Sequence, residues 1–227
     1  MNTSAVQSDS VPLLSVQHLG RQLSGRWLWR GVNFDMYPGD WLGLVAPSGA
    51  GKTLLLRMIA MLDPIYEGQL FFLGENVSQR SRPDYRTQVM YLAQQIASFD
   101  GTVQDNLQRV FSLSAHRHRR YDPEQIMCWL DKLGRRSTFL EQSVVQLSGG
   151  ERQILALLRS LQLNPQILLL DEPTASLDPD TTEQVEALIG QWLSQGDRAC
   201  IFTSHDPTQL QRVTTRQLLL TEFLVRP

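Results

Sequence analysis

Short apolar runs and longer apolar segments divide the chain into alternating predicted elements. Short runs rich in Leu, Ile, Val and Phe, bounded by Gly, Pro or Asp, predict β-strands. On this pattern strands are expected at residues 13–18, 32–36, 41–45, 69–73, 88–92, 167–171, 199–203 and 217–221. Longer segments, several of them next to prolines or capping residues, predict helices at residues 54–62, 103–113, 123–133, 150–162, 181–195 and 207–213.

The order of these elements predicts an α/β fold. Strands dominate the first part of the chain, residues 103–163 show helical patterns, and helices and strands alternate afterwards. The run 167–171 is apolar up to its final aspartate, as in a parallel sheet covered on both faces. Ligands of such sheets bind beyond the carboxyl ends of the strands. We expect a polar tail over residues 1–11, then one domain over 12–227 with a helical subdomain at about 95–163.

Composition narrows the classes of function. The chain has 21 Lys and Arg and 23 Asp and Glu residues, so its formal net charge is −2. This balance argues against a general nucleic-acid-binding protein, and no nucleic-acid partner is expected. No apolar run approaches the length of a membrane helix and the polar first residues resemble no secretory signal, so a soluble cytoplasmic chain is expected. Cys128 and Cys200 are expected to be buried thiols without a disulfide or zinc.

A glycine-rich segment between a predicted strand and an apolar helix predicts phosphate binding. It matches the pattern GxxxxGK[ST], except that Ala46 replaces the first glycine. Gly49 and Gly51 let several backbone N–H groups converge on one anion, and the N-terminus of the following helix adds a positive field. Lys52, one of only two lysines, would contact the β- and γ-phosphates, and the Thr53 hydroxyl would bind Mg²⁺. The predicted nucleotide contacts are Ala46, Pro47, Ser48, Gly49, Ala50, Gly51, Lys52, Thr53 and Leu54.

Asp171 and Glu172 directly follow an apolar strand. An acidic pair in this position is costly unless it faces a cation or water. Asp171 is predicted to hold Mg²⁺, and Glu172 is predicted to polarise the attacking water. Alone, the pair is also compatible with an acidic turn after a strand. Its combination with the phosphate loop favours a catalytic role.

The segment LSGGERQ at residues 147–153 resembles the signature motif of the ATP-binding cassette (ABC) ATPases, although Glu151 stands where that family most often has Gln. The resemblance extends over about residues 13–222, with the motifs in the family's order. It implies a P-loop NTPase core with a mainly parallel sheet, an N-terminal antiparallel β-subdomain and an inserted helical subdomain. It also implies that the signature contacts the ATP of a partner subunit, through Leu147, Ser148, Gly149, Gly150 and Glu151. A plain helix N-cap at Ser148 is a structural role compatible with the same residues.

Further site residues follow from the same resemblance. Gln94, or the adjacent Gln95, matches the family's Q-loop glutamine, which contacts Mg²⁺ and the attacking water. His205 matches the switch histidine, which contacts the γ-phosphate and is assigned to catalysis with Gln94 and Glu172. The matches to the D-loop, which crosses the dimer interface, are Ser176, Leu177 and Asp178.

One feature of the family is missing from its usual place. The adenine-stacking aromatic corresponds to Leu23 in this chain. Trp27 or Trp29 is therefore expected to offer an aromatic face to the base, unless both pack inside the β-subdomain. Trp27 is taken as the predicted adenine contact.

The resemblance implies an ATPase subunit, with ATP and Mg²⁺ as cofactors, that energises a separate membrane permease. Two copies would pair head to tail with two ATP between them, and the permease would hold the chain at the inner face of the cell membrane. The length of the chain and residues 99–107 are similar to those of small ATPases of iron-export or metal-stress transporters. The alternatives are an ABC-type ATPase that regulates a non-transport membrane complex, and a nucleotide-binding module with weak catalysis. The basic stretch 116–120 is interpreted as a solvated loop or as a contact for lipid headgroups or an acidic partner.

Overall fold

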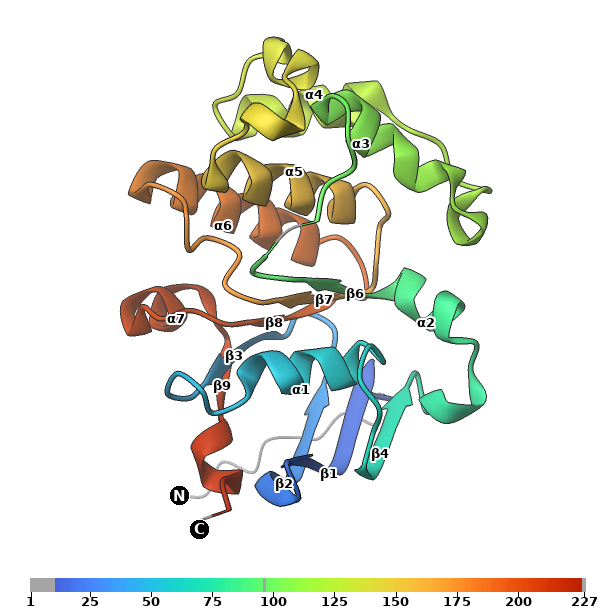
Figure 1. Ribbon diagram of the computed structural model, residues 1–227, viewed down its shortest axis with the longest axis vertical. Coiled ribbons are helices and arrows are strands. Elements are labelled where there is room, and N and C mark those ends of the chain that lie inside the picture. The colour runs from blue at the N-terminus through green and yellow to red at the C-terminus, as the bar shows by residue number, and fades with distance from the viewer. Residues whose placement is uncertain (1–10, 96, 226–227) are drawn as a thin grey trace, which may run out of the picture.

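A five-stranded parallel sheet forms the centre of the protein (Figure 1). The computed structural model describes residues 11–95 and 97–225. The strand order is β6-β7-β8-β3-β9, with bounds β3 (Trp41–Val45), β6 (Val89–Leu92), β7 (Ile167–Leu170), β8 (Ala199–Phe202) and β9 (Arg216–Leu219). The segments that follow β3, β7 and β8 therefore start from the same edge of the sheet, as the sequence predicts for its candidate site.

Helices cover both faces of this sheet. The helices are α1 (Lys52–Ile59), α2 (Arg82–Gln88), α3 (Val103–Arg109), α4 (Pro123–Lys132), α5 (Gly149–Leu161), α6 (Pro179–Leu193) and α7 (Pro207–Val213). In Figure 1, α1 lies on one face and α5 and α6 lie on the other. Ile167 and Leu169 of β7 pack in one apolar cluster with α1, and Leu168 and Leu170 pack in a second cluster with α5 and α6. Burial on both faces explains why this strand is apolar without alternation.

An antiparallel sheet of four strands flanks the α1 side of the core. Its order is β2-β1-β4-β5, with bounds β1 (Leu14–Leu23), β2 (Arg26–Met36), β4 (Glu67–Phe72) and β5 (Glu75–Asn76). Trp29 of β2 and Phe72 of β4 are fully buried in the cluster that contains α1. The expected β-subdomain therefore shares its core with the phosphate-loop helix.

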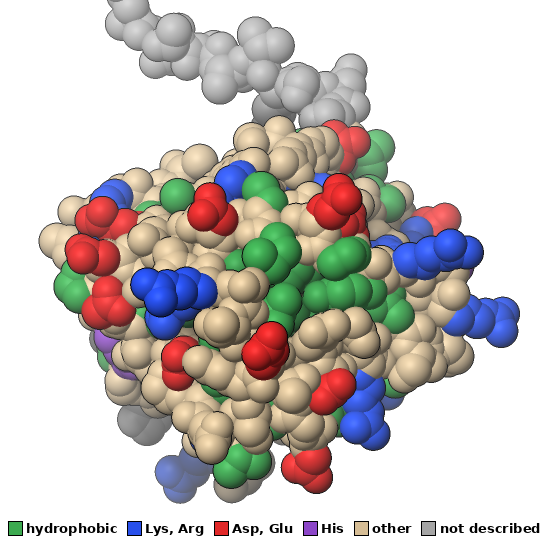
Figure 2. Space-filling model, turned by 90° about the horizontal axis from the view of Figure 1, so that it is seen from above, with side chains coloured by type: hydrophobic (Ala, Val, Ile, Leu, Met, Phe, Trp, Pro, Cys, Tyr) green, Lys and Arg blue, Asp and Glu red, His purple; other side chains and the backbone are tan. Residues whose placement is uncertain are grey.

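The segment between β6 and α5 forms a helical lobe that includes α3 and α4. Side-chain caps mark where its helices begin: Thr102 and Asp105 form a reciprocal capping box at α3, and Asp122 caps α4. Short 3-10 helices lie here and elsewhere, at Val77–Gln79, Val110–Ser112, Ser114–His116, Ser137–Glu141, Val144–Gln146 and Leu220–Phe223. Figure 2 looks down on this end of the molecule, where hydrophobic side chains gather near the middle of the face among charges of both signs.

Besides the 3-10 helices, one strand and one α-helix were not predicted, and several boundaries differ. The strand β5 is two residues long, and α2 has the mostly polar sequence RPDYRTQ, so neither has the apolar pattern on which the predictions rest. The helix expected at 103–113 ends at Arg109 and continues as a 3-10 turn. The helix expected from residue 181 begins at Pro179, because Asp178 caps it and proline is favoured in its first turn.

Two residues differ in exposure from what the sequence suggests: His116 in the basic stretch and Cys128, which was expected to be buried. His116 is 7% exposed, in a 3-10 helix that contacts α2, so the basic stretch is not wholly a solvated loop. Burial and the nearby Arg119 and His118 lower the pKa of His116. Cys128 is exposed on α4, whereas Cys200 is buried as expected.

The extent of the domain and of the helical subdomain stays a prediction, and residues 1–10 of the expected tail lie outside the described residues. Within residues 11–95 and 97–225, none of the helices has the length and hydropathy that crossing a membrane requires.

Candidate active site

The phosphate loop connects β3 to α1 in the conformation that its glycines predict. Gly49 and Gly51 have positive φ angles of 78° and 91°, which residues with a Cβ rarely adopt. At Gly51 a Cβ would also lie 2.6 Å from Leu28 Cδ2. Ala46 is not among the described non-glycine residues with positive φ, so its methyl group causes no backbone strain. The buried Lys52 Nζ donates a hydrogen bond of 2.9 Å to the Ala46 carbonyl, which keeps the ammonium at the loop.

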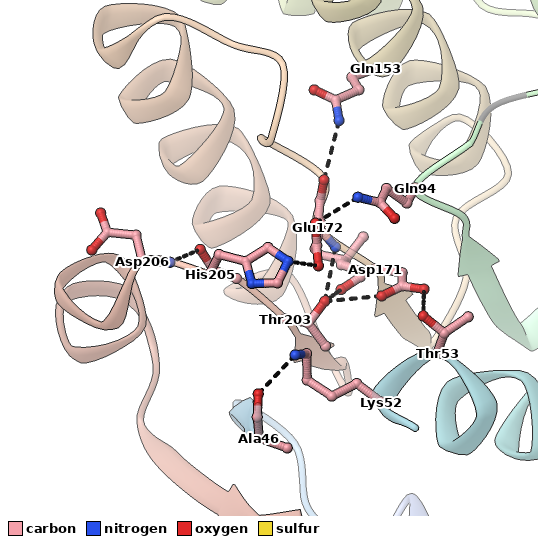
Figure 3. Close-up of polar contacts among 12 residues, drawn as sticks. Ala46, Lys52, Thr53, Gln94, Gln153, Asp171, Glu172, Thr203, His205 and Asp206 are labelled. Carbon is pink, nitrogen blue, oxygen red and sulfur yellow. Dashed lines mark hydrogen bonds and ion pairs between the residues drawn. The ribbon is translucent and has the colours of Figure 1, made fainter. Parts of the chain in front are cut away.

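Asp171 lies next to this loop with its carboxylate almost fully hydrogen-bonded. It is 3% exposed at the end of β7. Its Oδ2 accepts bonds from Thr53 Oγ1 at 2.7 Å and from Tyr91 Oη at 2.9 Å. Its Oδ1 accepts from Thr203 Oγ1 at 3.2 Å (Figure 3). Burial, the charge of Asp171 and this bond raise the pKa of Tyr91, so the phenol stays a donor. The two predicted Mg²⁺ ligands, Thr53 and Asp171, are thus brought into contact.

Glu172 is the centre of the second cluster. Its carboxylate lies 2.6 Å from His205 Nε2 through Oε1 and accepts a 2.7 Å bond from Gln94 Nε2 through Oε2 (Figure 3). The three residues predicted to act in catalysis therefore converge from three separate segments of the chain. Glu172 is 8% exposed and has a φ of 53°, a left-handed conformation that typically costs about 1–3 kcal/mol in a non-glycine residue. The surrounding structure must offset this strain.

Two residues that sequence reasoning missed hold the backbone of Glu172. Thr203, fully buried at the end of β8, accepts a 2.9 Å bond from the Glu172 N–H. Gln153 of α5 donates a 3.2 Å bond to the Glu172 carbonyl and accepts a 3.0 Å bond from the N–H of Ser176. Thr203 lies two residues before the predicted switch histidine His205, and this position in the sequence could have indicated that it belongs to the site. Gln153 lies in the signature segment 147–153, but the sequence predicts no contact of Gln153 with Glu172 or of Tyr91 with Asp171.

The signature segment begins α5 as a capped helix. Ser148 Oγ accepts from the Glu151 N–H at 3.2 Å, and Glu151 Oε2 accepts from the Ser148 N–H at 2.9 Å and from its hydroxyl at 2.8 Å. These bonds lower the pKa of Glu151, and the nearby charge of Arg135 adds a smaller effect. Ser148 and Glu151 therefore form a reciprocal capping box, so Ser148 has the N-cap role that the sequence also allowed.

The predicted D-loop packs directly on this helix start. A Cβ at Gly150 would lie 2.8 Å from the Ser176 carbonyl and 2.9 Å from Leu177 Cδ2, so only glycine allows the contact. Asp178 accepts bonds from the N–H and hydroxyl of Thr181 and thereby caps α6. Within the described part of the chain, no hydrogen bond joins the phosphate loop to the signature residues.

The two tryptophans considered for adenine have different environments. Trp29 is fully buried below Gly51, so the suggestion that it stacks on the base is wrong. Trp27 is half-buried, and the Arg30 guanidinium lies 4.6 Å from its ring centroid. Leu23 is 45% exposed at the end of β1. The adenine contact of Trp27 stays a prediction.

The residues around Asp171 fit a magnesium ion. A threonine hydroxyl, a carboxylate and a nearby glutamine amide are oxygen ligands of the kind that Mg²⁺ prefers. No cluster of three or more His, Cys, Asp or Glu side chains suited to a metal occurs among the residues that the structure describes.

Comparisons with known proteins agree with the motifs. Residues 29–175 match the family model described as ABC transporter. The chain is 34% identical to the probable iron export ATP-binding protein FetA of Escherichia coli K12 over 202 residues, or 89% of this chain and 88% of that protein. It is 33% identical to ABC transporter I family member 17 of Arabidopsis thaliana, over 92% of this chain and 78% of that protein. Among solved structures, the ATP-binding cassette MJ0796 in a dimeric post-hydrolysis state with ADP and phosphate has a TM-score of 0.77 at 22% identity, covering 91% of this chain and 93% of that one.

Proposed function

Because this chain belongs to the ABC transporter family and is one of its ATP-hydrolysing subunits, we propose that it drives a separate membrane permease as a head-to-tail dimer. One observation supports the catalytic part most strongly. Glu172 contacts both Gln94 and His205, and its neighbour Asp171 contacts Thr53 of the phosphate loop. The residues proposed as base, γ-phosphate contact and cation ligand thus lie close to the proposed phosphate loop.

In this proposal the ATP phosphates bind the N–H groups of the loop and Lys52, at the N-terminus of α1. Thr53, Asp171 and Gln94 would hold Mg²⁺, which would supply positive charge to the β- and γ-phosphates when bound. Glu172 orients and deprotonates the attacking water, and His205 donates a hydrogen bond to the γ-phosphate.

The second half of each site comes from the other copy. The N-terminus of α5 presents Ser148, Gly149 and Gly150, and free N–H groups at a helix start favour an anion. Ser148 would turn its hydroxyl from Glu151 to the γ-phosphate of the partner subunit's ATP. The packing of Ser176 and Leu177 on this helix start supports joint movement of the D-loop and the signature. ATP binding would then close the dimer, and hydrolysis would reopen it.

A groove beside β6 is the proposed docking site for the permease. It has a volume of about 270 Å³ and runs between the ends of α1 and α2 and the C-terminal part of α5. Leu62, Met90 and Tyr91 line it together with Arg86 and Arg159. An apolar groove with two guanidinium groups suits a short amphipathic helix that carries an acidic side chain. Binding there would place the chain at the cytoplasmic face of the membrane.

We also assign the transporter to the small iron-export type. The support is the 34% identity to the iron export protein, which extends over most of both chains. Relatives named for phosphate import are also similar, at 32% identity for one of Natronomonas pharaonis.

The test uses tagged Glu172→Gln, which is expected to bind ATP while hydrolysis falls by about 10²–10⁴-fold through loss of the base. Membranes are solubilised in mild detergent with ATP, and co-purifying proteins are identified. The matched control, Glu172→Gln combined with Lys52→Ala, should not close on ATP. A polytopic membrane protein that depends on Lys52 supports the proposal. A soluble or single-span partner would instead indicate the regulatory alternative, and near-normal turnover of Glu172→Gln would remove Glu172 from catalysis.

A further inference from the structure

Tyr91 makes a contact that the proposed mechanism does not use. Its phenol donates a 2.9 Å hydrogen bond to Asp171 Oδ2, the same oxygen that accepts from Thr53. Tyr91 and Asp171 are 80 residues apart in the sequence. Asp171 is 3% exposed, so few groups can reach its carboxylate.

The strand register explains how the phenol reaches Asp171. Tyr91 of β6 pairs with Leu169 of β7, two residues before Asp171, and the Asp171 N–H donates to the Leu92 carbonyl at 3.0 Å. Tyr91 packs against the same apolar cluster as Leu169, on the α1 face of the sheet. A side chain as long as tyrosine spans the two-residue offset, and its tip meets Asp171 beside Thr53.

We propose that Tyr91 is a positioning residue that fixes the Asp171 carboxylate for the divalent cation, an inference that rests on the function proposed above. The bond holds Oδ2 in place, as outer hydrogen-bond partners of metal ligands commonly do. Thr203 fixes the other carboxylate oxygen from β8. Donors from β6 and β8 therefore hold the carboxylate of β7 from both neighbouring strands.

The position of the phenol is itself constrained. The Tyr91 side chain is half-buried and also lines the groove beside Met90 and Arg159. The apolar cluster on the α1 side, against which the side chain packs, limits its movement. A phenol held in this way can fix the orientation of the Asp171 carboxylate.

The experiment compares Tyr91→Phe with Tyr85→Phe, both made in the Glu172→Gln protein so that ATP is not consumed. Tyr85 is the matched control: it is fully buried in the same apolar cluster, and its hydroxyl donates 2.8 Å to the Ile59 carbonyl rather than to the site. The dissociation constant of ATP is measured in EDTA and in excess Mn²⁺. Because free ATP itself binds Mn²⁺, the ratio of the two dissociation constants equals, by linkage, the factor by which the protein strengthens cation binding to ATP.

In Tyr91→Phe we expect the ratio to fall by about tenfold, the lower end of the usual loss for an outer partner of a metal ligand. The ATP dissociation constant in EDTA should not change, because Lys52 and the loop N–H groups hold the phosphates. Tyr85→Phe should keep both values. An unchanged ratio in Tyr91→Phe, or an equal fall in both variants, overturns the positioning role. A parent protein that binds no ATP, or whose affinity is insensitive to Mn²⁺, contradicts the proposed site itself and removes the basis of the inference.

Discussion

Thr203→Val tests whether the hydroxyl at the end of β8 holds the catalytic segment together. Threonine and valine have nearly the same shape, and the position is fully buried, so packing is kept and the hydrogen bonds are removed. The variant leaves the Glu172 N–H without its 2.9 Å acceptor, and it removes the 3.2 Å donor to the Asp171 carboxylate. The strained backbone of Glu172, with φ at 53°, loses one of the two side-chain hydrogen bonds that hold it.

The magnitude follows from these two bonds. Leaving a buried N–H unsatisfied costs about 1–3 kcal/mol, and a hydrogen bond to a charged group contributes about 1.5–3 kcal/mol. Because the contributions of two adjacent hydrogen bonds are not additive, we expect a total loss of about 2–4 kcal/mol in the free energy of unfolding. For a chain of this length that corresponds to a fall in Tm of roughly 5–15 °C. ATP turnover should fall as well, because Glu172 is no longer held in its conformation.

Calorimetry and an ATPase assay at a temperature where all variants are folded provide the measurements. Thr203→Ser is the control, because it keeps the hydroxyl and loses one methyl group, a change of about 1 kcal/mol. It should melt close to the wild type and keep its turnover. If Thr203→Val melted within about 2 °C of the wild type and hydrolysed ATP at the same rate, the reasoning would be refuted, since both bonds would then contribute nothing measurable.

Two further predictions concern the signature and the thiols. Glu151→Gln should reduce the free energy of unfolding at pH 7 by about 0.3–1 kcal/mol, because a carboxylate is favoured at a helix N-terminus. The pKa of Glu151 is lower in the folded than in the unfolded chain, so this contribution exists above the unfolded pKa and is lost as pH falls through the folded one. Urea unfolding at neutral and acidic pH should show the difference between the two proteins disappear, and a gap that persists in acid would contradict the assignment. A thiol reagent should modify the exposed Cys128 in the native protein and Cys200 only after denaturation, because Cys200 is buried and burial raises its pKa. Modification of both thiols before unfolding would show that the β8 region opens.

The sequence identifies the phosphate loop and the acidic pair because their chemistry is local. Gly49 and Gly51 are required by backbone angles within one loop, and Lys52 and Thr53 follow them directly. Strand β7 is recognisable because burial on both faces leaves it continuously apolar. These features depend on neighbours in the chain.

Other elements could not be predicted from local pattern. Helix α2 is polar apart from Tyr85, which is buried because the helix packs on the end of the core. His116 belongs to a basic stretch that looks solvated, yet it is buried where the helical lobe contacts α2. Trp29 and Trp27 are near neighbours with the same chemistry. Only the strand pairing decides that Trp29 is fully buried in the core and Trp27 is half-buried under Arg30.

The sequence by itself determines which groups are available for nucleotide chemistry, since loop conformation, helix capping and strand burial follow from short-range pattern. The tertiary structure decides which groups meet. Tyr91 and Asp171 are 80 residues apart, and Thr203 and Glu172 are 31 apart. Their contacts exist because β6, β7 and β8 are adjacent in one parallel sheet in a register that brings their carboxyl ends together. Strand order and register result from packing of the whole core, so no local pattern contains them.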